Sequence, residues 1–452
     1  MTDVAATTRR IWTREATALA GLSACGLALL LITGLVLRLD EIIDWNLIVL
    51  LLLVSGAITI TATKAATQAP IGLGLAIVLL GALALRLLVL TQDPLFSDDI
   101  YRYIWDGMVQ GAGINPYRFV PADPVLASLR DAVIFPNINR ADYATTIYPP
   151  VAQAFFFVVT QLGASVTAMR LALIGCEIVT LLVLIDLLYR CGKPVTLAAA
   201  YAWHPLPVWE IANNGHVDAL MTTLVMIGTW LAARHRKLVA GFAIALGALV
   251  KPYAVVALAA CWRPWDCRLP LVVIAVVLAC YLPYLGAGRG VFGFLFTGYL
   301  HEEGFQSGDG FWLVHAVRVL LGDVPGLLAL YLSLAAATIG ALALRVAFTP
   351  DDSPQQKTRD IATLLLTTLF FLSPNYPWYF LVVVPFIPLG GGVPAWTVSL
   401  GGFLLYLTYP DYAARFLLWK GVISGAFIIA VLAPAVHARI FDRLQGAFRW
   451  TG

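Results

Sequence analysis

The chain has 452 residues, of which 60% are hydrophobic and 12% are charged, and its formal net charge is +3. Soluble domains contain roughly 45–50% apolar and about 25% charged residues, so this composition excludes a soluble globular protein. Many apolar runs approach the roughly 20 residues that a membrane-spanning helix needs. The sequence therefore predicts an all-α polytopic membrane protein, with membrane lipids and no nucleic acid among its partners.

Apolar segments follow one another along the chain, and the Lys and Arg residues between them indicate which ends face the cytoplasm. Arg9, Arg10 and Arg14 place the N-terminus inside. The first apolar segment is too long for the core of a signal peptide, so we expect it to remain as an anchor. The expected spans are 16–37, 46–62, 71–91, 168–189, 195–211, 217–233, 237–250, 252–262, 269–286, 324–346, 361–376, 377–390, 395–409 and 415–434.

The apolar run 148–163 is not among these spans, because we expect it to lie at the outer surface as a juxtamembrane helix. If it crossed the membrane, later basic clusters such as Arg234 and Arg236 would face outward, which basic loops resist. This topology makes both termini cytoplasmic and makes 92–165 and 287–323 the large extracytoplasmic loops. Several spans are short, so we expect about 12 to 14 in total within one domain, 1–452.

The unusual polar residues gather on the expected outer side, which predicts a single site there. The first loop opens with Asp98 and Asp99, two adjacent carboxylates that are costly at a membrane boundary unless they are solvated or have a chemical role. The four contributing segments are 97–148, 210–218, 301–309 and 373–379.

Three short motifs in the first loop support a family resemblance. They are Asp98-Asp99-Ile100-Tyr101, Gly113-Ile114-Asn115-Pro116-Tyr117 and Ile147-Tyr148-Pro149-Pro150. In this order and spacing they resemble the first extracytoplasmic loop of GT-C superfamily glycosyltransferases, in particular the bacterial polyprenyl-phosphate-mannose-dependent mannosyltransferases of the family 87 type. The similarity covers about residues 90–165, with weaker support from 200–255. It implies a GT-C-like bundle of transmembrane helices with extracytoplasmic juxtamembrane helices.

The resemblance implies that one of the two carboxylates is the catalytic base. Ser97 stands where the first Asp of the family's Asp-x-Asp pattern would be, so Asp99 matches the second Asp and Asp98 has no strict counterpart. Asp99 is the candidate base, with Asp98 as its positioner or substitute. The alternative is structural: Ser97 caps a helix 98–112, and the two carboxylates only stabilise its first turn.

Two further residues of this loop are candidate substrate-binding groups. Arg102 follows Asp99 by one helical turn and either pairs with it, as a plain surface ion pair, or reaches the donor phosphate. Tyr148 lies near the acceptor in one interpretation and only shapes the loop in the other. Tyr103 and Trp105 are typical of an interfacial aromatic belt.

A second constellation contains Glu210, Asn214, His216 and Asp218, and it resembles a recurrent Glu-x5-His-x-Asp stretch in bacterial GT-C enzymes. We expect these residues to bind the donor phosphate or an acceptor hydroxyl. A zinc site lacks a clear third and fourth ligand, so no metal is predicted. Alternatively, Asp218 only caps a helix.

Two more candidates follow along the chain. Lys251 interrupts an apolar run and either contacts the phosphate or snorkels to the headgroups. His301, in the second loop, is a further candidate, although its acidic neighbours also fit a solvated charge run. Trp378 and Tyr379 fit the aromatic belt, and His204 has a structural role.

The sequence thus predicts a glycosyltransferase of the bacterial plasma membrane, with its active site on the outer face and no cofactor. The expected reaction moves a sugar, in particular mannose, from a polyprenyl-phosphate donor to a lipid-linked glycan or glycolipid. The alternatives are a lipid or glycan flippase without chemistry, and a polymerase or ligase that uses lipid-diphosphate glycans. The acceptor, the stereochemistry and the oligomeric state stay open.

Overall fold

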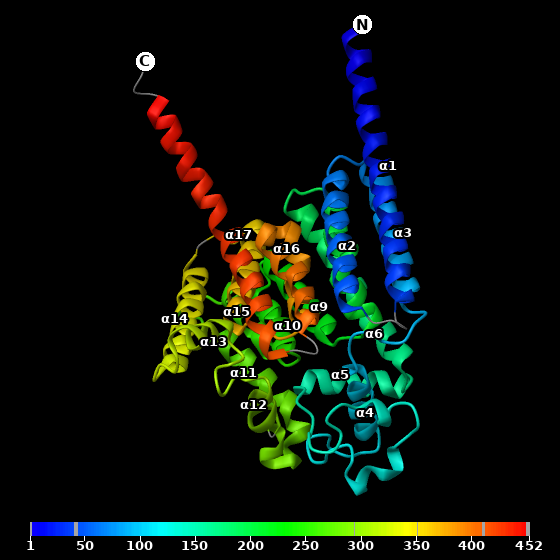
Figure 1. Ribbon diagram of the computed structural model, residues 1–452, viewed down its shortest axis with the longest axis vertical. Helices are drawn as coiled ribbons and strands as arrows, with labels where there is room; N and C mark the ends of the chain where they lie inside the picture. The colour runs from blue at the N-terminus through cyan, green and yellow to red at the C-terminus, as the bar shows by residue number, and fades with distance from the viewer. Residues whose placement is uncertain (1, 40–43, 293, 350, 409–411, 449–452) are drawn as a thin grey trace.

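The computed structural model describes residues 2–39, 44–292, 294–349, 351–408 and 412–448, and within them all regular structure is helical. Long helices stand roughly side by side in a bundle (Figure 1). Both α1 and α17 extend from one end of this bundle, whereas α4, α5 and the loop around them lie at the opposite end. The long helices are α1 (Thr2–Arg38), α2 (Trp45–Ala66), α3 (Ile71–Val89), α6 (Val166–Arg190), α9 (Asp218–Ala233), α11 (Arg268–Tyr281), α14 (Leu327–Phe348), α15 (Pro354–Leu372) and α17 (Tyr412–Phe448).

Eight described segments are long and apolar enough to cross a membrane, which confirms the predicted class of all-α polytopic membrane protein. They are fewer than the 12 to 14 spans expected, because several expected spans are short or broken helices. Proline and glycine cause these interruptions, since a proline removes a backbone donor and clashes with the preceding turn. The interrupted part contains η3 (Val195–Ala198), α7 (Ala199–Ala202), α8 (Pro205–Pro207), η4 (Val208–Asn213), α10 (Lys237–Ala248), η5 (Pro252–Ala260), η8 (Pro377–Phe386), η9 (Ile387–Gly391), α16 (Gly392–Gly401) and η10 (Gly402–Thr408).

The expected juxtamembrane segment forms α5 (Pro150–Leu162), a helix of 13 residues that begins directly after Pro149. At about 1.5 Å per residue such a helix is only about 20 Å long, shorter than the roughly 30 Å hydrocarbon core of a bilayer. It packs against α4 (Asp99–Gly111) and α6. Its length is therefore compatible with a helix that lies beside the membrane rather than across it.

The connections at the end of the bundle with α4 and α5 carry short helices. The first loop contains η1 (Pro124–Leu129) and η2 (Phe135–Asn137). The second large connection contains η6 (Leu282–Phe292), η7 (Leu295–Tyr299), α12 (Leu300–Glu302) and α13 (Trp312–Leu321). Figure 1 places α12 and its neighbours at the same end as α4. The two predicted loops therefore meet at one end of the bundle.

Candidate active site

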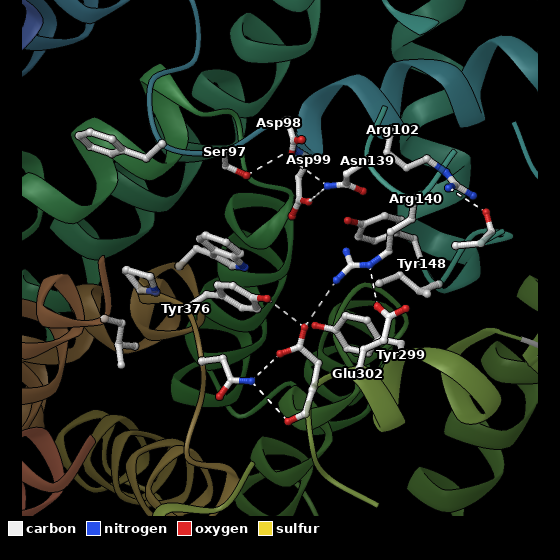
Figure 2. Close-up of a pocket in the computed structure, with 18 of the residues that line it drawn as sticks. Ser97, Asp98, Asp99, Arg102, Asn139, Arg140, Tyr148, Tyr299, Glu302 and Tyr376 are labelled. Atoms are coloured by element: carbon white, nitrogen blue, oxygen red, sulfur yellow. Dashed lines mark hydrogen bonds and ion pairs between the residues drawn. The ribbon is translucent and has the colours of Figure 1, made fainter. Parts of the chain in front are cut away.

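A cavity of about 530 Å³ lies where these loops meet. Six parts of the chain line it, and the polar lining residues include Asp98, Asp99, Arg102, Asn139, Arg140, Tyr148, Lys251, Tyr299, Glu302, Glu303, Asn375, Tyr376 and Tyr406. Figure 2 shows the side chains around this cavity and labels ten of them. Of the four segments expected to build one site, 97–148, 301–309 and 373–379 contribute lining residues, whereas no residue of 210–218 lines the cavity.

Asp98 and Asp99 stand at the start of α4, where the chain turns from the loop into the helix. The backbone N–H of Asp99 donates to the Ser97 hydroxyl at 3.3 Å, but the N-cap position of α4 belongs to Asp98, whose side chain makes no capping hydrogen bond. Both carboxylates line the cavity. The Asn139 amide donates to Asp98 at 2.8 Å and to Asp99 at 3.3 Å. Burial raises the pKa of the Asp98 carboxyl; the hydrogen bond from Asn139 opposes this increase and the nearby Asp99 charge adds to it.

Asn139 and Arg140 are site residues that the sequence reasoning missed, because they carry no motif. Arg140 has φ of 55°, in the left-handed region that a non-glycine residue rarely adopts and that is often found at functional sites. Its Nε lies 2.7 Å from Glu302 and its Nη2 lies 4.0 Å from Glu303 (Figure 2). The first loop therefore holds the second loop against the cavity through ion pairs.

The structure corrects one of the two roles expected for Arg102, the ion pair with Asp99, whereas a contact with donor phosphate stays a prediction, since Arg102 also lines the cavity. Its Nε contacts Asp106 at 2.9 Å rather than Asp99, and its Nη1 donates to the Ala144 carbonyl at 3.1 Å. Asp106 is 1% exposed and also accepts a hydrogen bond from Gln153 at 2.8 Å. Arg102 is thus neither the partner of Asp99 nor a surface ion pair: it compensates a buried carboxylate and holds the loop to α4.

The second constellation is folded back toward Asp99 by a tight turn after η4. Gly215 has φ of 73°, and a Cβ there would lie 2.4 Å from the Ile100 side chain, so the turn requires glycine. The turn places His216 Nδ1 3.8 Å from Asp99 Oδ2 and His216 Nε2 3.3 Å from Glu210 Oε2. His216 therefore lies between two carboxylates.

The other members of this constellation are buried beneath the cavity rather than exposed in it. Glu210 is 0% exposed and accepts hydrogen bonds from the Tyr406 hydroxyl and from the Asn214 amide. The Asn214 carbonyl oxygen in turn accepts from the backbone N–H of Phe96 at 2.9 Å, just before the Asp98–Asp99 pair. These side chains thus lie beneath Asp99, on the side away from the cavity. Direct contact with substrate, which the sequence suggested for Glu210, Asn214 and His216, does not fit this position.

Lys251 lies in the turn between α10 and η5, and its ammonium group faces the protein interior. It lies 3.4 Å from Asp218 Oδ2 and 4.6 Å from the ring centre of Tyr379, and it lines the cavity. This contradicts the alternative in which Lys251 snorkels to the headgroups. Asp218 is the first residue of α9 and is 0% exposed, so it is the buried counter-ion of this lysine.

Three aromatic expectations and one histidine expectation were wrong. Tyr103 and Trp105 are buried at 0% and 1% exposure rather than in an interfacial belt: Tyr103 stacks on Phe156 of α5, and Trp105 packs against Phe135 of η2. Trp378 lines the cavity and stacks on His216, with ring centroids 4.0 Å apart. His301 is exposed and does not line the cavity. At α12 and the residues on either side of it, Tyr299, Glu302 and Glu303 line the cavity, so Glu302 and Glu303 occupy the place predicted for His301.

Tyr148 does line the cavity, and it is held by its neighbours. Its backbone carbonyl accepts a hydrogen bond from the Tyr117 hydroxyl at 2.6 Å, and its ring packs edge-on against Tyr103. The Asn-Pro-Tyr and Tyr-Pro-Pro motifs are thereby joined to each other. Glu303 is held similarly by Asn375 and Tyr376; burial raises the pKa of its carboxyl and these hydrogen bonds oppose the increase.

Within the described chain, no group of three or more His, Cys, Asp and Glu side chains is arranged to hold a metal ion. His204, expected to be structural, is fully buried, lies 3.0 Å from the Ser399 hydroxyl and stacks on Trp396.

Comparison with known proteins links this site to one enzyme family. Residues 82–265 match the family described as "Alpha-(1->6)-mannopyranosyltransferase, N-terminal domain". A 200-residue region is 25% identical to a "Probable alpha-(1->6)-mannopyranosyltransferase" of Mycolicibacterium smegmatis, and it covers 42% of this chain and 34% of that protein. The aligned region thus spans about a third of the relative's length. No solved structure matches. The matched region contains both constellations, and the match confirms the predicted resemblance to mannosyltransferases.

Proposed function

We propose that this protein is a membrane mannosyltransferase that transfers mannose from a polyprenyl-phosphate donor to a lipid-linked glycan or glycolipid. The observation that carries the proposal is the pair Asp98 and Asp99 at the wall of a 530 Å³ cavity, inside the region that matches the mannosyltransferase family. A cavity of this size suits a sugar ring and its phosphate, since small-molecule sites commonly enclose about 300–1,000 Å³.

The chemistry assigned to the site is a single displacement at the anomeric carbon. An oxygen of Asp99 accepts the proton of the acceptor hydroxyl as the acceptor oxygen bonds to C1. The bond from C1 to the phosphate oxygen breaks, and its electron pair leaves with the polyprenyl phosphate. Lys251 and Arg140 line the same cavity and supply the positive charge that stabilises the departing phosphate. Asn139 orients both carboxylates.

We place the reaction on the outer face of a bacterial plasma membrane. Two observations support this side. The basic residues between the apolar segments favour cytoplasmic termini. The helices α4 and α12, which contribute residues to the cavity lining, lie at the end of the bundle opposite to the one from which α1 and α17 project (Figure 1). The chain also lacks a Gly-rich phosphate loop for a nucleotide sugar, which favours a lipid-linked donor.

The test is transfer by the purified protein in lipid nanodiscs, with synthetic polyprenyl-phosphate-[³H]mannose and a glycolipid extract as acceptor. We expect label to appear in a glycolipid product with the wild-type protein and not with Asp99→Asn. Label that appears only with GDP-mannose or with a lipid-diphosphate glycan would overturn the donor assignment. Donor that crosses the bilayer of proteoliposomes without any transfer would support a flippase and overturn the proposal.

A further inference from the structure

We infer that Glu303 determines sugar specificity by accepting hydrogen bonds from hydroxyl groups of the sugar on the donor lipid. Because that sugar is part of the donor, this assignment rests on the proposed function and names the side chain that recognises the transferred group. Glu303 directly follows the single turn of α12 and lines the cavity, although its side chain is only 5% exposed. It is therefore shielded from bulk water and available to a ligand in the cavity.

Two directional hydrogen bonds hold this carboxyl group. The Asn375 amide donates to one of its oxygens, and the Tyr376 hydroxyl donates to the other at 3.0 Å. A carboxylate has about four acceptor positions, so each oxygen keeps one after these two bonds. Protonation would exchange one acceptor position for an O–H donor, which can also bond a hydroxyl group. Glu303 can thus contact sugar hydroxyls in either protonation state.

The orientation of Asn375 is fixed from the membrane helix α17. Lys420 of this helix is 3% exposed, and its ammonium group donates to the Asn375 side-chain oxygen. An ammonium group can only donate, so the Asn375 oxygen faces Lys420 and its NH2 group faces Glu303. The same ammonium group donates to the backbone carbonyls of Ser373 and Gly310. A buried chain of hydrogen bonds therefore sets the position of the Glu303 carboxyl group.

The neighbouring aromatic rings suit the apolar face of a sugar. Tyr376 lines the cavity and stacks on Trp378, with ring centroids 4.5 Å apart and planes 6° from parallel. Trp378 stacks in turn on His216 at 4.0 Å. Rings held in this way offer an apolar surface to the C–H groups of a sugar, while Glu303 offers acceptors to its hydroxyls. A hexose has both kinds of surface, whereas a phosphate group or a polyprenyl chain has only one of them.

Arg140 places Glu303 beside the proposed phosphate site. Its Nη2 lies 4.0 Å from Glu303 Oε1, and Figure 2 shows its side chain between Asp99 and Glu302. Arg140 is one of the two cations assigned to the departing phosphate, and the transferred sugar is bonded directly to that phosphate. The hydroxyls of the transferred sugar, rather than those of the acceptor, are therefore the ones beside Glu303.

The test compares donors that differ in a single hydroxyl group. Polyprenyl-phosphate-mannose and the analogues that each lack one hydroxyl are assayed with the wild-type protein and with Glu303→Gln. A site that bonds a substrate hydroxyl rejects the analogue without it, so the wild type should reject at least one deoxy donor. We expect Glu303→Gln to lower kcat/KM about tenfold or more for the mannose donor, but less than about threefold for that analogue. Because each donor is compared between two proteins, differences in its intrinsic reactivity cancel.

A binding measurement reports on the same contact without turnover. In Glu303→Gln the affinity for polyprenyl-phosphate-mannose should fall about tenfold or more, whereas the affinity for polyprenyl phosphate without sugar should stay within about threefold of the wild type. Glu303→Asp keeps the acid but shortens the side chain by one methylene group. It should change both measurements in the same direction as Glu303→Gln.

Asp309→Asn is the matched control. Asp309 is also a carboxylate of the second loop, and it accepts a hydrogen bond from Arg318 at 2.6 Å, but it does not line the cavity. This variant should keep the wild-type preference between the donors and the wild-type affinity for both lipids.

The outcomes separate this inference from the function it rests on. If the wild-type protein transfers no mannose, the proposed function fails, and the binding measurement alone decides whether Glu303 contacts the sugar. If Glu303→Gln loses the same factor with every donor, or binds both lipids equally weakly, Glu303 only holds the second loop and the inference is overturned. A higher KM for the acceptor with an unchanged preference between donors overturns it as well. Should Glu303→Gln not fold, the same outcomes with Glu303→Asp decide.

Discussion

Replacing Asp99 by Asn should abolish transfer with little effect on folding. The side chain of Asp99 is 22% exposed, lies in the first turn of α4, and accepts one long hydrogen bond of 3.3 Å from Asn139. A charge at the start of a helix contributes about 0.3–1 kcal/mol, and an ordinary hydrogen bond about 1 kcal/mol. The variant should therefore lose at most about 1–2 kcal/mol of stability, since Asn still accepts from Asn139.

The expected loss of activity is larger by comparison. An amide cannot accept the proton of the acceptor hydroxyl, and a positioned base contributes about 10²–10⁴-fold to the rate. That range corresponds to about 3–5 kcal/mol of activation barrier. Initial rates with labelled donor and melting curves in the same detergent separate the two effects.

The matched control is Asp123→Asn. Asp123 also starts a short helix of the first loop, η1, and accepts from the backbone N–H of Val125 at 2.9 Å, but it does not line the cavity. The Asp123→Asn variant should keep the wild-type rate of transfer. Wild-type turnover in Asp99→Asn, or an equal loss in Asp123→Asn, would refute the assignment of Asp99 as the base.

Four further outcomes are expected. Burial raises the pKa of Asp98, so the ionised form of this carboxyl opposes folding. Asp98→Asn should therefore raise the melting temperature at neutral pH. This gain should disappear as the pH falls below the raised pKa, because wild-type Asp98 then becomes protonated. It should reduce transfer less than Asp99→Asn does. Arg102→Met leaves buried Asp106 unpaired and should cost about 3–5 kcal/mol, seen as a lower melting temperature, whereas an unchanged melting curve would contradict the buried ion pair. Transfer should survive excess EDTA, because Lys251 and Arg140 can stabilise the phosphate. If EDTA abolishes activity and Mn²⁺ or Mg²⁺ restores it, the acidic residues of the cavity hold a metal ion instead. In a cysteine-free background, Ala164→Cys should react with an impermeant thiol reagent on intact cells and His235→Cys should not, although both positions are exposed in the fold; the reverse labelling would refute the topology.

The lipid environment explains why part of the site could be found from the sequence. Asp98, Asp99, Glu210, His216 and Lys251 are ionisable residues next to apolar segments, where each is costly without a partner. That cost makes such residues visible in a single sequence. The structure brings all five together around or beneath one cavity.

Asn139 and Arg140 could not be found in this way, because they are ordinary polar residues in a polar loop. Their importance comes from long-range contacts, to Asp98 and Asp99 for Asn139 and to Glu302 for Arg140. The choice of Glu302 over His301 depends on which side of one helical turn faces the cavity, and residue type contains no information about that orientation.

The sequence by itself determined the helical membrane class, the polar loop with its carboxylate pair and the family resemblance, since apolar run length, basic residues and short motifs are properties of the chain alone. Only the tertiary structure decided the partners: Arg102 pairs with Asp106, Lys251 with Asp218, and His216 with both Asp99 and Glu210. An ion pair is chosen by distance and burial, and the broken helices around Gly215 and Pro252 set those distances only after the bundle has packed.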